Sequence, residues 1–288
     1  MKINTVFVIG AGAMGTGIAQ ISAQAGQNVI LYDISSQQTS AALKHISESL
    51  DRRIAKGAMT VDEKKEIQNR ITVSDSLSAA SEADLVLEAV AEKLEIKKKL
   101  FSEISKYAKD DAILASNTSS ISITSIATAV NNPERFIGLH FFNPATAMKL
   151  LEIIPGLRTS EETLKDAKAW GESLHKIMIV ANDTPGFIVN RLLNLMLNEA
   201  AILIEEGIAP EDIDKGMKYG LNHPMGPLEL ADFAGVDILN ACMNTYYSEF
   251  KDSKYRPALR LERMVESGYI GKKARHGFYE YNDKGERI

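Results

Sequence analysis

The sequence VFVIGAGAMGTG, residues 6–17, decides the fold of this chain. An apolar run, Val6–Ile9, leads directly into a glycine-rich turn, and a helix-like stretch follows. A strand, a tight turn and a helix start in this order are typical of the first half of a dinucleotide-binding βαβ unit. Gly10 permits the tight turn, Gly12 lets the backbone approach a pyrophosphate, and Gly15 lets helix and strand pack closely. The stretch therefore predicts an α/β domain with a dinucleotide site.

Asp33 indicates which dinucleotide is bound. The second apolar run, Val29–Tyr32, ends in front of it, where an acid can meet the adenosine ribose hydroxyls. A carboxylate there repels a 2′-phosphate, and no arginine follows closely, so NAD is favoured over NADP. The alternative interpretation is an ordinary glycine-rich turn and an acid that caps a helix. It would explain the turn or Asp33 separately, but not the strand, turn, helix and acid together. The predicted loop contacts are Gly10, Ala11, Gly12, Ala13, Met14 and Gly15.

Apolar runs of strand length alternate with helical patterns over about the first 180 residues, which is typical of a mostly parallel sheet covered on both faces. The further predicted strands are Leu85–Ala89, Ala112–Ala115, Phe136–Leu139, Leu150–Ile154 and Ile177–Val180. Amphipathic stretches at 37–54 and 94–108 predict helices. The stretch 62–70, rich in Glu and Lys, predicts a helical hairpin inserted after the second strand.

A change of pattern near Pro185 predicts a domain boundary. Thr184, Pro185 and Gly186 interrupt the chain, and a long apolar helix then runs to Gly207. Another helix begins at Pro210, and the rest shows helical patterns only. We therefore expect a Rossmann-type α/β domain over residues 1–184 and an all-α domain over residues 185–288.

Composition excludes several classes of function. The 288 residues are 45% hydrophobic and 25% charged, as in globular proteins. A formal charge of −5 gives no case for nucleic acid or an anionic membrane, and no apolar run approaches the ~20 residues that cross a bilayer. One cysteine, Cys242, and no Cys/His cluster argue against an internal disulfide and a metal site. With no room for a signal peptide before the first strand, a cytoplasmic protein is expected.

Polar side chains follow two of the predicted strands. Ser119 lies in SNTSSIS after one strand, and His140 begins HFFNP after another. Glu152 stands inside the apolar stretch KLLEIIP, where a buried carboxylate needs a partner, and His140 is the obvious candidate. A carboxylate on one imidazole nitrogen fixes the tautomer and leaves the other nitrogen to shuttle a proton. The pattern predicts an acid/base site at the carboxyl ends of the strands.

Each of these residues also has an ordinary structural interpretation. His140 could be a hydrogen-bonded core histidine, and Ser119 or Ser120 could cap the helix that follows. Asn190, in FIVNR, could be a solvent-facing helix residue, and Lys56 could be a solvated lysine at a helix end.

The chain resembles the L-3-hydroxyacyl-CoA dehydrogenase family, most closely a bacterial branch that acts on 3-hydroxybutyryl-CoA. The match is collinear from Val6 to Tyr281 and consists of long motifs. They are GAGAMGTGIA, EAVAEKLEIKKKLF, LASNTSSI, GLHFFNPATAMKLLEII, DTPGFIVNRLL, NHPMGPLEL and GFYEY.

The resemblance implies roles for individual residues. His140 would be the general acid/base, Glu152 its orienting partner, and Ser119 and Asn190 would hold the substrate. The implied cofactor contacts besides the loop are Asp33, Glu92, Lys97, Asn117, Asn143 and Lys273. Ser49, Lys56 and Ser119 would contact the coenzyme A substrate. The sequence departs from the family at Arg275 and His276, before GFYEY, where a glycine is common.

The expected activity is NAD-dependent, reversible oxidation of a short-chain (S)-3-hydroxyacyl-CoA. One alternative is a related dehydrogenase of a sugar acid or small hydroxy acid. Another is a noncatalytic NAD-binding protein, which predicts a decayed site, whereas Ser119, His140, Glu152 and Asn190 are all present. The apolar faces of 187–204 and 236–247 predict a homodimer formed through the helical domain.

Overall fold

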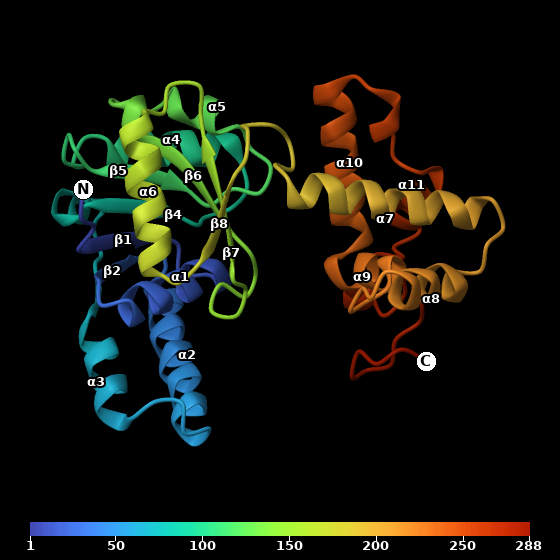
Figure 1. Ribbon diagram of the computed structural model, residues 1–288, viewed down its shortest axis with the longest axis horizontal. Helices are drawn as coiled ribbons and strands as arrows, with labels where there is room; N and C mark the ends of the chain where they lie inside the picture. Colours follow the sequence, from blue (N-terminus) through green and yellow to red (C-terminus); the bar gives the residue numbers. More distant parts are fainter. The chain divides into compact units, whose positions relative to one another are not determined.

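The computed structural model describes all 288 residues, and they form two compact units, Met1–Thr184 and Pro185–Ile288 (Figure 1). The first unit is an α/β unit with a mostly parallel sheet and the second is helical, so the predicted fold class is confirmed.

The sheet of the first unit has eight strands in the order β3-β2-β1-β4-β5-β6-β7-β8. They are β1 (Thr5–Ile9), β2 (Asn28–Tyr32), β3 (Ile71–Val73), β4 (Leu85–Glu88), β5 (Ile113–Ser116), β6 (Phe136–Phe141), β7 (Leu150–Pro155) and β8 (Ile177–Val180). All neighbours are parallel except β6 and β7, which pair antiparallel. The carboxyl ends of β1, β4, β5 and β6 therefore meet at one edge.

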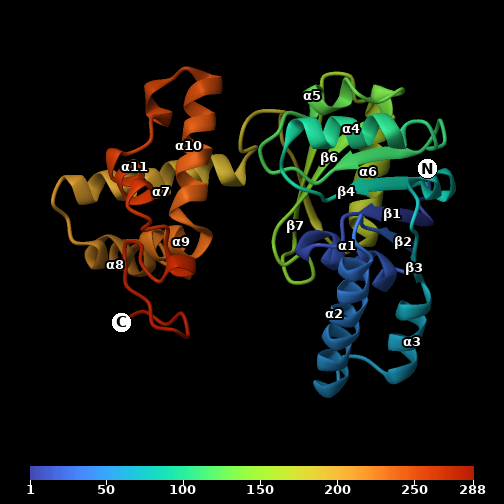
Figure 2. The ribbon, with the colours of Figure 1, turned by 180° about the vertical axis from the view of Figure 1, so that it is seen from behind.

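Helices cover both faces of the sheet. They are α1 (Ala13–Gln24), α2 (Ser36–Ala55), α3 (Val61–Asn69), α4 (Leu94–Ile104), α5 (Ile123–Ala127) and α6 (Glu161–Ser173), with 3₁₀ turns at Leu77–Glu82 and Pro133–Arg135. Helix α6 lies on one face, and α4 and α5 lie on the other (Figures 1 and 2). Helices α2 and α3 form the predicted hairpin, which projects from the unit (Figure 2).

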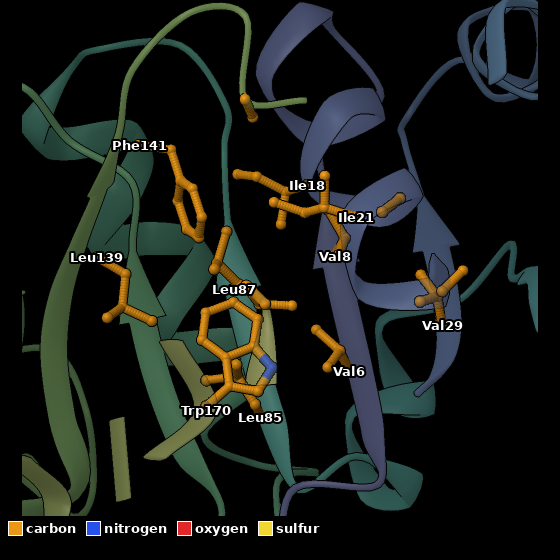
Figure 3. Close-up of a cluster of buried hydrophobic side chains, with 14 of the residues drawn as sticks. Val6, Val8, Ile18, Ile21, Val29, Leu85, Leu87, Leu139, Phe141 and Trp170 are labelled. Carbon is orange, nitrogen blue, oxygen red and sulfur yellow. The ribbon is translucent and has the colours of Figure 1, made fainter. Parts of the chain in front are cut away.

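The main core lies between the sheet and helices α1 and α6. Figure 3 shows Val8 of β1 beside Ile18 of α1, with Trp170 of α6 close to Leu85 of β4. Alternate residues of β1, such as Phe7 and Ile9, are buried too. The strands read as continuous apolar runs because helices cover both faces. Burying each large side chain contributes roughly 1.5–3 kcal/mol.

The structure differs from the sequence-based expectation at three elements. Strand β3 was not predicted, because it has three residues and Thr72 and Val73 are exposed, so no apolar run marks it. Strand β6 continues past the expected end at Leu139 to Phe141, so His140 lies within the strand rather than after it. Pairing with β7 sustains those last two residues. Helix α4 ends at Ile104 instead of 108.

The second unit is built from helices α7 (Val189–Glu205), α8 (Pro210–Gly220), α9 (Pro227–Ala234), α10 (Val236–Phe250) and α11 (Leu259–Glu266), with 3₁₀ turns at Ser253–Tyr255 and Lys272–Ala274. Leu197, Met243 and Leu261 belong to its core. The buried Asp232 ties down the C-terminal segment, accepting hydrogen bonds from the Phe278 N–H and the Tyr281 hydroxyl. No helix in either unit combines the length and the apolar character needed to span a membrane.

Candidate active site

The glycine loop has the geometry that its sequence predicts. Gly10 adopts a φ of +103°, and a Cβ on Gly15 would lie 1.7 Å from the Gly10 carbonyl oxygen. A Cβ on Gly12 would meet nothing within 4 Å, so it points into open space before the N-terminus of α1. This is room into which a phosphate group fits, facing the unpaired N–H groups of the helix.

Asp33 follows β2 and anchors the same loop. Its Oδ2 accepts a hydrogen bond from the Ala11 N–H at 2.8 Å, and its Oδ1 accepts one from the Ser35 N–H at 2.9 Å. Each carboxylate oxygen keeps a lone pair for a ribose hydroxyl. A cavity of about 600 Å³ opens beside it, with Gly10, Gly12, Ile34, Leu77, Ile96 and Leu100 among its walls. The loop, the acid and the apolar walls fit a dinucleotide.

His140 and Glu152 are brought together by the pairing of β6 with β7. They stand directly opposite each other in the antiparallel register, and Nδ1 of His140 lies 2.7 Å from Oε2 of Glu152. His140 is 4% exposed and Glu152 is fully buried. The carboxylate therefore meets the imidazole where almost no water competes for either group.

Ser119 occupies the other side of the imidazole. Its Oγ lies 3.2 Å from Nε2 of His140. The interpretation of Ser119 or Ser120 as a helix cap was wrong, because the N-cap of α5 is Ser122, whose side chain accepts from the Ser125 N–H. Ser119 as a whole is exposed, and its contact with His140 is partly buried.

Gly138 allows α5 to approach β6 closely. A Cβ there would lie 2.6 Å from Cδ1 of Ile123 and 3.0 Å from Cβ of Ile154. The close packing of α5 on β6 therefore explains the glycine in GLHFF, and the sequence alone did not indicate this packing.

Glu92 holds the turn that carries Ser119. Its Oε1 accepts from the Thr118 hydroxyl at 2.6 Å and from the backbone N–H groups of Ser119 and Ser120 at 2.8 and 3.1 Å. Burial alone would raise the pKa of this carboxyl. The charge of Lys97 and the hydrogen bonds just named outweigh burial, so the pKa lies below its ordinary value. Glu92 is therefore a carboxylate at neutral pH.

Lys97 and Glu88 form a buried ion pair beneath that turn. Nζ of Lys97 lies 2.6 Å from Oε1 of Glu88 and 3.4 Å from Oε2 of Glu92. Both members of the first pair are fully buried, while Glu92 keeps an exposed edge. Glu88 was missed by sequence reasoning, although, like Glu152, it is a carboxylate inside a predicted apolar strand.

Asn117 and Asn143 take different positions. Oδ1 of Asn117 accepts from the Phe141 N–H at 2.9 Å, so it ties the end of β5 to β6. Asn143 is exposed in the turn after β6 and precedes the cis proline Pro144.

A second cavity, of about 630 Å³, lies between α1, α2 and the β6–β7 connection. Ser49 and Asn143 line it together with Arg52, a cation that sequence reasoning did not single out. Ser49 also accepts a hydrogen bond from the Gln20 amide at 3.2 Å. Lys56 is exposed at the C-cap of α2 and is not among the residues that line the cavity.

The remaining two predicted site residues, Asn190 and Lys273, belong to the second unit. Asn190 is in the first turn of α7 and is half-buried. Lys273 is exposed and lies 2.7 Å from the carboxylate of Asp237. Arg275 adopts a left-handed conformation with a φ of +61°, which favours glycine. No group of three or more His, Cys, Asp or Glu side chains is arranged to hold a metal ion.

Known proteins are similar to this chain over nearly its whole length. The chain is 47% identical over 285 residues to a probable 3-hydroxybutyryl-CoA dehydrogenase of Bacillus subtilis, covering 99% of each protein. It is 44% identical over 280 residues to a 3-hydroxybutyryl-CoA dehydrogenase of Bradyrhizobium diazoefficiens, covering 97% of this chain and 96% of the relative. The crystal structure of (S)-3-hydroxybutyryl-CoA dehydrogenase from Ralstonia eutropha superposes with a TM-score of 0.96 at 44% identity, covering 98% of this chain and 100% of that one.

Family models match both units. Residues 5–184 match the NAD-binding domain of 3-hydroxyacyl-CoA dehydrogenase, and residues 186–281 match its C-terminal domain. The chain therefore belongs to the 3-hydroxyacyl-CoA dehydrogenase family.

Proposed function

We propose that this protein catalyses the reversible, NAD-dependent oxidation of a short-chain (S)-3-hydroxyacyl-CoA, such as 3-hydroxybutyryl-CoA, to the 3-oxoacyl-CoA. The observation that carries the proposal is the position of His140 between Glu152 and Ser119, at the sheet edge that also holds the glycine loop. Names of relatives that are 44–47% identical over nearly their full length support the substrate.

His140 moves the proton in this reaction. Glu152 holds Nδ1, which fixes the tautomer and leaves Nε2 to face Ser119 and the substrate. The chemistry that NAD supplies when bound is hydride transfer with carbon 3 of the substrate. Nε2 accepts the hydroxyl proton during oxidation and returns it to the oxygen during reduction. Ser119 donates a hydrogen bond to that oxygen and stabilises its changing charge.

The cavity between α1 and α2 takes the coenzyme A portion of the substrate. Coenzyme A carries phosphates, and Arg52 supplies a positive charge beside Ser49 on the same wall. Lys56, one helical turn farther along the chain, adds charge near the end of α2. Asn190 and Lys273 are assigned to the substrate and the cofactor, respectively, on the family motifs alone.

The protein forms a homodimer through its helical unit. Leu192 of α7, Phe233 of α9 and Ile238 of α10 are 67%, 65% and 53% exposed. Large apolar side chains in this number at a surface indicate a protein partner, and a second copy of the chain is the simplest one. Light scattering after size exclusion should give twice the mass of the chain, 31.6 kDa. The monomer mass would contradict the dimer.

An absorbance assay of NADH consumption tests the activity. Acetoacetyl-CoA should be reduced with NADH much faster than with NADPH, and a longer 3-oxoacyl-CoA reports the range of chain lengths. Turnover of free acetoacetate without turnover of its CoA thioester would favour a dehydrogenase of small hydroxy acids. NADH binding with no turnover of any 3-oxo substrate would favour a noncatalytic protein.

A further inference from the structure

The turn between β6 and β7, residues 143–148, forms one wall of the cavity proposed for coenzyme A. Four of its residues line that cavity of about 630 Å³, namely Asn143, Pro144, Ala145 and Thr146. The turn lies beside α1 (Figure 2), where Gly17 lets it approach closely. A Cβ on Gly17 would lie only 3.1 Å from Cβ of Ala145. The position of this turn therefore decides the width of the cavity.

Little packing supports the turn from behind, because a second cavity lies there. This cavity of about 610 Å³ is bordered by Thr146, Ala147, Met148 and Lys149 of the same connection. Within the turn, the N–H groups of Ala147 and Met148 both donate to the Pro144 carbonyl at 3.0 Å. A segment with open space on both sides has few buried contacts, so its stability depends on specific hydrogen bonds.

The ammonium group of Lys176 supplies hydrogen bonds of this kind. Its Nζ donates to the carbonyl oxygens of Ala145 and Met148, both at 2.6 Å, and so joins the two ends of the turn. Hydrogen bonds from a charged donor are about twice as strong as those between neutral groups. Burial lowers the pKa of the Lys176 ammonium group, and no nearby carboxylate opposes this. The two carbonyls, and not an acid, are therefore the partners of this charge.

The backbone at the end of α6 aims Lys176 at the turn. His175 adopts a left-handed conformation with a φ of +56°. The N–H groups of His175 and Lys176 donate back to the carbonyls of Glu172 and Gly171, at 2.9 and 3.1 Å. This pattern is a Schellman cap, which ends a helix and turns the chain in a defined direction. Lys176 therefore leaves α6 and enters β8 along a fixed path.

We propose that Lys176 is a positioning residue for the coenzyme A portion of the substrate: it holds the 143–148 turn in place as a wall of the cavity. The inference rests on the proposed function, which puts coenzyme A in that cavity. Lys176 itself borders the second cavity and not the first, so it acts through the turn. Because the wall is held before the substrate arrives, binding does not have to order it.

The first test is Lys176→Met, which keeps the length of the side chain and removes both hydrogen bonds. With saturating NADH, the KM for acetoacetyl-CoA should rise about 5- to 20-fold while kcat stays within about twofold, the pattern of lost substrate binding. Acetoacetyl-N-acetylcysteamine ends long before the phosphates of coenzyme A and does not fill the cavity, so its KM should not change. An equal rise for both thioesters would place the defect at the reaction centre and overturn the inference.

Lys149→Met is the matched control for charge. Lys149 is exposed and borders the same cavity as Lys176, but its side chain holds no part of the turn. Its KM for acetoacetyl-CoA should equal that of wild type. If Lys149→Met raised the KM as much as Lys176→Met, general attraction of the coenzyme A phosphates would explain both effects, and the positioning role would be refuted.

Lys176→Arg tests whether the two hydrogen bonds are what matters. A guanidinium group also donates to two carbonyls at once, and the second cavity gives the larger side chain room. The KM should return to within about threefold of wild type, because the donors are restored. A KM as high as that of Lys176→Met would contradict the assigned role.

Hydrogen exchange reports on the turn without any substrate. The amides of Ala147 and Met148 should exchange faster in Lys176→Met than in wild type, and those of α1 should not change. Lys176→Gln covers the case in which the methionine variant does not fold. It stays polar but loses the charge, so its KM should rise about threefold or more. Wild-type KM and exchange in either variant would refute the inference. Failure of the wild-type protein itself to reduce acetoacetyl-CoA would refute the proposed function instead.

Discussion

His140 and Glu152 face each other across the only antiparallel strand pair of the sheet, with 2.7 Å between Nδ1 and Oε2. The sheet is parallel elsewhere, and the reversal between β6 and β7 is what sets a carboxylate opposite a histidine. Cross-strand partners stand close together, so the pairing register itself orients the imidazole.

The role of His140 is tested by His140→Gln. This change keeps an amide donor for Glu152, whereas alanine would leave that carboxylate buried without its partner. The kcat for acetoacetyl-CoA reduction should fall roughly 10²- to 10⁴-fold, as expected for loss of a general acid/base, while NADH titration gives an unchanged Kd. Turnover near the wild-type rate would remove His140 from the proton transfer.

Asp33→Ala should weaken NADH binding by about 10- to 100-fold, because hydrogen bonds to a charged group contribute about 1.5–3 kcal/mol. Loss of the carboxylate also removes the repulsion of a 2′-phosphate, so the preference for NADH over NADPH should narrow. Fluorescence titration with both cofactors measures this, with the exposed Asp62→Ala of α3 as control. An unchanged preference would show that Asp33 does not contact the ribose.

Gly138→Ala should lower the free energy of unfolding by about 1–3 kcal/mol, the usual cost of overpacking a core. The new Cβ would approach Ile123 to 2.6 Å. Gly216→Ala serves as the opposite case, since that helical glycine has nothing within 4 Å of its Cβ position and alanine should be neutral or stabilising there. Urea denaturation compares the two. Equal stability of Gly138→Ala and wild type would mean that α5 shifts freely.

Arg275→Gly should raise the free energy of unfolding by up to about 1 kcal/mol, because a left-handed conformation is costly for a side chain with a Cβ. Arg275→Val should lower it. Both substitutions also remove an exposed ion pair between Arg275 and Asp283. The free energy of unfolding of Asp283→Ala is therefore measured as a control, and it should differ little from that of wild type. A loss of stability in Arg275→Gly would show that this backbone position is not strained.

Glu92 should make stability depend on acid pH. Its pKa in the folded protein lies below the ordinary value of 4.5, so its stabilising contribution is fully present above that value. The contribution is lost as the pH falls through the lowered pKa, because the unfolded state then binds the proton more readily. Denaturation at a series of pH values gives the free energies of unfolding of wild type and Glu92→Gln. The difference between them should disappear as the pH falls below about 4.5. A difference in free energy of unfolding that does not change with pH would contradict the lowered pKa of Glu92.

Several features could be read from the sequence because their chemistry is local. The glycine loop needs only a strand, a turn and a helix start, and Asp33 needs only the end of the next strand, so residues adjacent in the chain determine both. Glu152 was recognisable because a carboxylate in an apolar run calls for a partner. The same reasoning did not find β3, whose three residues are too few to show a pattern.

The tertiary structure alone decided which groups meet across elements. The sequence made Ser119 a possible helix cap, and the fold gave that place to Ser122 and set Ser119 against His140. The sequence did not indicate that Lys97 is buried beside Glu88 and Glu92, and the fold decided it. The sequence by itself determined the loop, the acid and the histidine, because each is recognised within one segment of chain. Burial and ion pairing depend on segments far apart in the chain, so only the packed sheet could decide them.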